Sequence, residues 1–160
     1  MRSVDYKVPS STGREGLSSW LKRACVVIII SHSSYLIPHA LAQYNTDRLI
    51  SIGRTALYFE DYVLSMQYFN QVITAKPYLY EPWFLRGVAK YNLDDFTGAE
   101  ADCTEAIARN PFVTSVYELR GLTRIQQKKY AEAVSDYNHA LRLAPDSRNL
   151  WHNRVLCHIQ

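Results

Sequence analysis

The residues best suited to acid–base or metal chemistry lie scattered along this chain. His139, His152 and His158 have no ligand-like spacing to any cluster of carboxylates or thiols. No serine has a histidine and an acid spaced to activate it, and phosphate-loop, Cys-x-x-Cys and His-Glu-x-x-His motifs are lacking. Asp94-Asp95 is better explained as a turn that supplies charge to the next helix N-terminus than as a paired acid. We therefore expect no enzyme, no metal site and no cofactor.

The most regular charges are three arginines that recur at one constant interval, namely Arg86, Arg120 and Arg154. Asp102 and Asp136 follow the first two at one common, shorter spacing. The corresponding upstream positions hold Ile52 and Tyr68, so both charges are missing together. This covariation predicts a salt bridge between two paired helices. The alternative is an arginine ladder for an anionic ligand, because further basic or titratable residues follow each arginine by four positions: Lys90, Arg124 and His158.

Other residue types recur at the same interval as these arginines. It relates three prolines, Pro77, Pro111 and Pro145, and three glycines, Gly53, Gly87 and Gly121. Apolar residues between these markers recur at helical spacing, whereas nothing alternates as a strand would. A fixed period of this size indicates a solenoid of stacked helical units. We expect seven helices, arranged as three pairs and one unpaired last helix.

These positions resemble the tetratricopeptide repeat family, which combines aromatic, glycine, alanine and proline residues at fixed places. The third repeat carries the fullest set, namely Tyr117, Gly121, Ala133, Tyr137 and Pro145. The departures are Ser65 for the alanine, Cys103 for an aromatic residue and Val155 for a fourth glycine. The resemblance implies an all-α, right-handed solenoid of antiparallel helix pairs, in a domain over residues 43–160. The repeats would span 46–79, 80–113 and 114–147, with the first helix of a fourth at 148–160.

The resemblance also implies a binding surface, because in this family the first helix of each repeat lines a concave groove for an extended peptide or a partner helix. By resemblance the groove residues are Arg54, Tyr58, Phe84, Val88, Tyr91, Asn92, Leu122, Ile125 and Gln126. Members that capture chaperone C-terminal carboxylates need lysine, asparagine and arginine where this chain has Ile50, Leu85 and Leu119. We therefore expect a protein or peptide partner held by apolar anchors. Alternatively, further repeats or the chain's own leader cover these residues.

The segment 1–42 is of a different kind. Lys22-Arg23 precedes an apolar run, and Ala40-Leu41-Ala42 ends the segment, as in a secretory signal peptide cleaved before Gln43. This predicts export to the periplasm or the extracellular space, and otherwise a cytoplasmic protein. A disordered leader and a retained membrane anchor are the alternatives, although the segment is polar for a membrane span.

Removing this leader changes the charge balance. It holds five of the 18 Lys and Arg residues and two of the 15 Asp and Glu residues, which leaves 13 of each. The remainder is neutral, so we expect no nucleic acid as a partner. Cys103 and Cys157 lie in different repeats and are predicted to be small core residues, without a disulfide.

The last residues carry no polar capping face, which terminal repeats normally have. We interpret the chain as part of a longer, exported bacterial protein of this family. The first functional hypothesis is a non-enzymatic protein-interaction scaffold. The second is an accessory module of a larger enzyme or of a secretion or assembly component, whose activity lies beyond residue 160.

Overall fold

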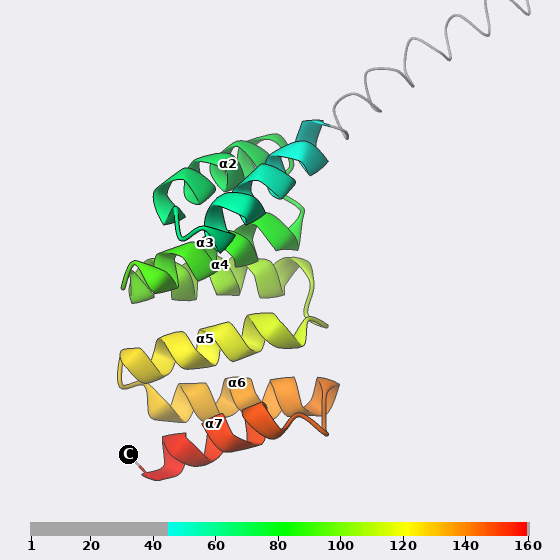
Figure 1. The fold of residues 1–160 in the computed structure, drawn as a ribbon. Helices are drawn as coiled ribbons and strands as arrows, with labels where there is room; N and C mark the ends of the chain where they lie inside the picture. Colours follow the sequence, from blue (N-terminus) through cyan, green and yellow to red (C-terminus); the bar gives the residue numbers. More distant parts are fainter. Residues whose placement is uncertain (1–44, 160) are drawn as a thin grey trace, which may run out of the picture. The chain divides into compact units, whose positions relative to one another are not determined.

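The computed structural model describes residues 45–159, which form seven helices and no strand (Figure 1). The helices cover residues 45–58 and then α2 (Tyr62–Ala75), α3 (Tyr80–Asn92), α4 (Phe96–Arg109), α5 (Thr114–Gln126), α6 (Tyr130–Leu143) and α7 (Arg148–Ile159). The prediction of an all-α solenoid is confirmed. The predicted signal peptide or leader, residues 1–42, lies outside the described residues.

Equivalent helices begin at the same point of each repeat, at Tyr80, Thr114 and Arg148. We call the 45–58 helix, α3, α5 and α7 the leading helices, and α2, α4 and α6 the trailing helices. Each trailing helix packs against the leading helices next to it in the chain. In addition, α3 contacts α5 and α5 contacts α7, whereas α2, α4 and α6 do not touch one another. Since the leading helices contact one another across repeats and the trailing helices do not, the leading helices line the concave side.

Tight turns separate the two helices of each pair. Glu60, Asp94 and Lys128 adopt φ values of 61°, 59° and 61°, in the left-handed region that reverses the chain direction within a few residues. Asp61 and Asp95 then cap the following helices, because their carboxylates accept from the backbone N–H of Leu64 at 3.1 Å and of Gly98 at 2.9 Å. The turn predicted at Asp94-Asp95 is confirmed.

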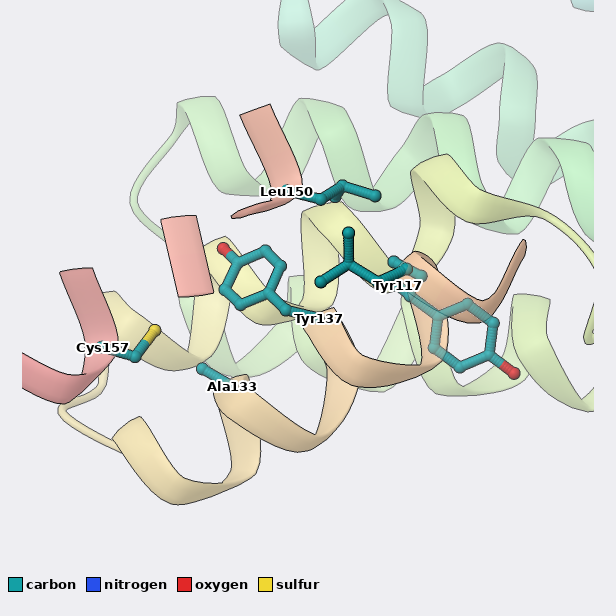
Figure 2. Close-up of a cluster of buried hydrophobic side chains, with 7 residues drawn as sticks. Tyr117, Ala133, Tyr137, Leu150 and Cys157 are labelled. Atoms are coloured by element: carbon teal, nitrogen blue, oxygen red, sulfur yellow. The ribbon is translucent and has the colours of Figure 1, made fainter. Parts of the chain in front are cut away.

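The core lies between the helices of each pair and joins one pair to the next. Figure 2 shows the part formed by α5, α6 and α7, a buried cluster that includes Tyr117, Ala133, Tyr137, Leu150 and Cys157. Tyr137 is fully buried, and its ring lies against Gly121 of α5. A glycine on the leading helix thus allows an aromatic ring of the trailing helix to pack directly on its backbone.

The loops between repeats are fixed to the leading helices that follow them. Trp83 donates its indole N–H to the backbone oxygen of Pro77 at 3.1 Å. Trp151 makes the same bond to Pro145 at 2.8 Å, six residues earlier in the chain as before. These bonds tie the end of one repeat to the start of the next, and so set the angle at which repeats stack.

Candidate functional site

The periodic arginines are bound within the helix pairs. Arg86 binds both carboxylate oxygens of Asp102, at 2.8 and 2.7 Å. Arg120 binds Asp136 in the same way, with a shortest distance of 2.7 Å. The two aspartates are 3% and 1% exposed, and the arginines 17% and 14%. The salt bridge predicted within the second and third repeats is therefore confirmed, and Arg86 and Arg120 do not form an open ladder for an anionic ligand.

The second cation of each set joins the same carboxylate. Lys90 lies 3.0 Å from Asp102, and Arg124 lies 2.8 Å from Asp136. Arg124 also binds Glu100 of the preceding repeat at 2.9 Å, and Lys129 binds that carboxylate at 2.7 Å. Carboxylates thus balance these like charges, and Glu100 links the second repeat to the third.

The predicted groove residues all lie on leading helices, and the two on the 45–58 helix, Arg54 and Tyr58, are exposed. Arg54 forms an ion pair with Glu81 of α3 at 2.6 Å, which spans two neighbouring leading helices. Tyr58 is 82% exposed and packs edge-on against Phe59. A cavity of about 250 Å³ lies beside this ion pair, lined by Asp47, Ile50, Ser51, Arg54 and Glu81.

The α3 residues of the predicted groove also support the core. Phe84, Val88 and Tyr91 are half-buried and pack against a cluster made by Cys103, Ala106, Val116 and Leu119. Tyr91 further contacts the ring of Phe96 edge-on, with centroids 5.6 Å apart. Asn92 is exposed, and its side-chain amide donates to the Val88 backbone oxygen at 2.8 Å. Only part of each apolar side chain on α3 is therefore left for a ligand.

The α5 residues lie next to a larger cavity, about 350 Å³ in volume. Ile125 and Gln126 line it together with Lys128, Tyr130 and Leu156. Leu122 is half-buried on the same helix. Sequence reasoning missed the last three lining residues. Leu156 could have been found, because it stands one repeat after Leu122, whereas Lys128 and Tyr130 come from a turn and a trailing helix.

The positions that would need basic or amide side chains for a terminal carboxylate are apolar. Leu119 is 8% exposed and belongs to the core, and Ile50 and Leu85 are half-buried. A carboxylate buried there would find no donor from these three side chains, which is unfavourable. The geometry of these positions thus favours contacts with apolar groups over binding of an anion.

Nothing in the described residues resembles a metal site, since no group of three His, Cys, Asp or Glu side chains comes together. Cys103 and Cys157 are free and buried, as predicted. Burial raises the pKa of the Cys103 thiol to about 12. His139 stacks on Tyr117 at the surface. No helix within residues 45–159 has both the length and the apolar content to cross a membrane.

Comparisons with known proteins agree with this architecture. Residues 115–147 match the tetratricopeptide repeat family model. Over 62 residues, or 39% of its length, the chain is 39% identical to the human and mouse RNA polymerase II-associated protein 3, and the match spans 9% of those proteins. These animal relatives give no support to the bacterial, exported origin inferred from the leader.

Solved structures resemble the whole helical unit. The first TPR domain of Spaghetti (RPAP3), bound to the HSP90 peptide SRMEEVD, is 26% identical with a TM-score of 0.69, and the match covers 71% of this chain and 93% of that one. The Arabidopsis OM64 TPR domain, at 22% identity and a TM-score of 0.72, has the same fold over 74% of this chain and 98% of its own. The family-model match to residues 115–147 and the shared fold thus show a tetratricopeptide-repeat type of helical solenoid.

Proposed function

We propose that the leading helices bind an extended peptide or a partner helix, chiefly through apolar side chains, and that the protein acts as an interaction scaffold. The observation that carries this proposal is the 350 Å³ cavity between α5, the start of α6 and α7, where Ile125, Tyr130 and Leu156 supply apolar walls. A cavity of this size holds one large aliphatic or aromatic side chain, and such anchors dominate the energy of many interfaces.

The comparison with Spaghetti (RPAP3) supports a peptide as the class of ligand, since that domain is bound to SRMEEVD. The chemistry of recognition differs in this proposal. Three carboxylate-binding positions of such members are occupied by Ile50, Leu85 and Leu119. The exposed cation Arg54 is already paired with Glu81. The ligand is therefore held by its side chains and not by a terminal carboxylate.

The experiment uses the full chain and two sets of probes. The first is SRMEEVD with a free or an amidated C-terminus. The second is a set of peptides selected by display against the full chain. Binding is followed by fluorescence anisotropy at low and high salt. We expect selected peptides to be rich in aliphatic or aromatic residues, to bind with little salt dependence, and to bind equally well as acids and amides.

Leu156→Ala tests the cavity directly, because Leu156 is 42% exposed and lines it. Val63→Ala is the matched control, since Val63 is 56% exposed on the trailing helix α2. We expect the first variant to weaken selected peptides by about tenfold or more, and the second to leave them unchanged. Tight binding of SRMEEVD that is lost on amidation, with no effect of Leu156→Ala, would show that the apolar mechanism is wrong.

A second candidate function is an accessory module of a larger protein. The observation that favours it is the 9% share of RNA polymerase II-associated protein 3 spanned by the matching segment. In this case the groove would bind a segment of its own larger protein or of an assembly partner. To test this, a longer gene product is purified and digested with protease. If the module is an accessory one, its groove is already filled, and the product does not bind the selected peptides.

A further inference from the structure

The turn between the 45–58 helix and α2 carries large apolar side chains that face solvent. Phe59 is 74% exposed, and Val63 and Leu64, in the first turn of α2, are 56% and 37% exposed. Leu93, in the equivalent turn of the next pair, is 44% exposed. Figure 1 shows the turns within pairs along one edge of the solenoid and the loops between repeats along the opposite edge. We call Phe59, Val63, Leu64 and Leu93 the turn-edge surface.

The other repeats show that the fold does not require large apolar residues at these positions. The places of Phe59, Val63 and Leu64 are taken by Leu93, Thr97 and Gly98 in the second repeat and by Gln127, Ala131 and Glu132 in the third. All three repeats nevertheless form the same left-handed turn and the same trailing helix. Thr97, Ala131 and Glu132 are exposed as well, so exposure is a property of these positions in every repeat. Exposed apolar residues that the fold does not need indicate an interaction surface.

Negative charge is concentrated at the same two turns. Glu60-Asp61 lies in the first turn and Asp94-Asp95 in the second, and all four side chains are exposed. Within residues 45–159 none of these carboxylates forms an ion pair. The helix α2 contains no charged residue, and the third turn, which lacks a large apolar residue, holds Lys128-Lys129 instead. Apolar surface and unpaired acidic groups therefore occur together.

We propose that the turn-edge surface docks a segment of a partner protein that carries apolar side chains between lysines or arginines. The apolar side chains cover Phe59 and Val63, and the cations pair with the carboxylates of Glu60 and Asp94. Charge complementarity is the argument for this occupant. An acidic segment or an anionic lipid surface would be repelled, and a second copy that used the same surface would oppose like charges.

This surface is separate from the groove, which is lined by the faces of the leading helices. Tyr58 is the point where the two approach each other, because it is a groove residue and packs edge-on against Phe59. The variants below therefore leave Tyr58 unchanged. The proposal does not rest on the groove function, and Leu156→Ala, which tests the groove, should not affect binding at the turn edge.

The probe is a pair of libraries of short displayed peptides, both with aliphatic or aromatic residues at the same fixed positions. The positions between them are Lys or Arg in the basic library and Asp or Glu in the acidic library. Both libraries are selected against the full chain under identical conditions. Enriched clones are synthesised, and their binding to the full chain is measured by fluorescence anisotropy at low and high salt.

We expect clones to be enriched from the basic library only, and to bind more weakly at high salt. Phe59→Gln introduces the side chain that the third repeat has at Gln127, and should weaken these clones by about tenfold or more. Phe112→Gln is the matched control, since Phe112 is 78% exposed in a loop on the opposite edge. It should leave the affinity unchanged.

A second pair of variants tests the charges. Asp94→Lys copies Lys128, which has the same left-handed backbone conformation, so the turn itself should be preserved. It should weaken the basic clones by about tenfold, because a carboxylate partner is replaced by a like charge. Asp146→Lys makes the same change of charge at an exposed position in a loop between repeats, and should have little effect.

Several results would overturn the assignment. Enrichment from the acidic library, or from neither library, would show that the stated chemistry is wrong. Equal loss with Asp94→Lys and Asp146→Lys would mean non-specific attraction between charges, and clones insensitive to Phe59→Gln would bind elsewhere. Self-association of the full chain that Phe59→Gln abolishes would identify a second copy as the occupant. Displacement of the clones by a synthetic peptide of residues 20–31 would identify the chain's own N-terminal segment.

Discussion

Gly121 and Tyr137 are matched to each other across the α5–α6 pair, because a β-carbon at Gly121 would lie 2.8 Å from the Tyr137 ring carbon Cζ. Gly53 and Phe69 repeat this relationship at 2.6 Å. The second repeat differs, since Gly87 faces Cys103, and its nearest neighbours would be at 3.4 Å or beyond. The glycine is therefore required only where the trailing helix carries an aromatic ring.

Replacement of these glycines by alanine should have opposite effects. We expect Gly121→Ala to lower the unfolding free energy by about 1–3 kcal/mol, since the fully buried ring must shift in a packed core. Gly87→Ala should be neutral or stabilising by up to about 1 kcal/mol, because alanine is the better helix former and its β-carbon has room. Urea unfolding of both variants checks this. Equal destabilisation by the two changes would contradict the conclusion that glycine is required only opposite an aromatic ring.

The Arg120–Asp136 pair should show strong coupling. Asp136 is 1% exposed, so Asp136→Ala leaves Arg120 and Arg124 without their carboxylate and should cost about 3–5 kcal/mol. The combination Arg120→Ile with Asp136→Tyr copies the first repeat, which has Ile52 and Tyr68. It should cost clearly less than the two single changes added together. A double-mutant cycle in urea measures this coupling. A coupling energy of zero would show that the interaction between Arg120 and Asp136 does not stabilise the fold.

Periodicity explains why the fold and the arginine–aspartate pairs could be predicted from the sequence. A residue type that recurs once in every repeat marks the same place in each, so covariation between two such positions reports a contact. Arg86 with Asp102 and Arg120 with Asp136 were found in this way. The contacts of the arginines to Asn70, Thr104 and Asn138 were missed, although these also recur, because their chemical type changes and their partner lies in the next repeat.

An interaction that occurs in only one repeat cannot be predicted from the periodicity of the sequence. Glu100 binds Arg124, Gln127 and Lys129, and the last two have no equivalents of like chemistry in the other repeats. The groove shows the same limit. The resemblance selects leading-helix residues, but the wall formed by Lys128 and Tyr130 depends on how the α5–α6 turn folds against α7. The burial of Phe84, Val88 and Tyr91 against the core depends on the angle between repeats, which no single-residue pattern encodes.

The leader should direct export and be removed. The basic pair Lys22-Arg23, the apolar run after it and Ala40-Leu41-Ala42 motivate this expectation. When the full chain is produced in a secreting host, N-terminal sequencing should find a product that begins at Gln43. An intact N-terminus on protein from the cytoplasmic fraction would count against export.

Lys128 holds a backbone conformation that disfavours its side chain, with φ at 61°. The left-handed region costs a residue with a β-carbon about 1–2 kcal/mol. Glycine avoids most of this cost, but the greater conformational freedom that it gives the unfolded chain offsets part of the gain. We expect Lys128→Gly to stabilise the domain by about 0.5–1 kcal/mol in thermal or urea unfolding. Lys128→Ala is the control, because it removes the same charge but keeps the β-carbon. Stabilisation by both would assign the effect to charge.

Glu100 should make stability depend on pH in the acid range. Burial alone would raise the pKa of Glu100, but hydrogen bonds from Lys129, Arg124 and Gln127 outweigh it and lower the pKa from 4.5 to about 2. Because the pKa is lower in the folded than in the unfolded state, the unfolded chain binds the proton first as the pH falls. The stabilisation is therefore complete above about pH 5 and is lost progressively between the two pKa values.

The matched variants are Glu100→Gln and Glu105→Gln, since Glu105 also has an arginine partner but is 49% exposed. Urea unfolding at pH 7 and at pH 3 gives the change in unfolding free energy for each. Glu100→Gln should destabilise at pH 7 and flatten the decline towards pH 3, because the group that takes up the proton is gone. Glu105→Gln should follow the natural chain at both pH values. If both variants keep the same acid sensitivity as the natural chain, the carboxylate that links the second and third repeats is not the group responsible.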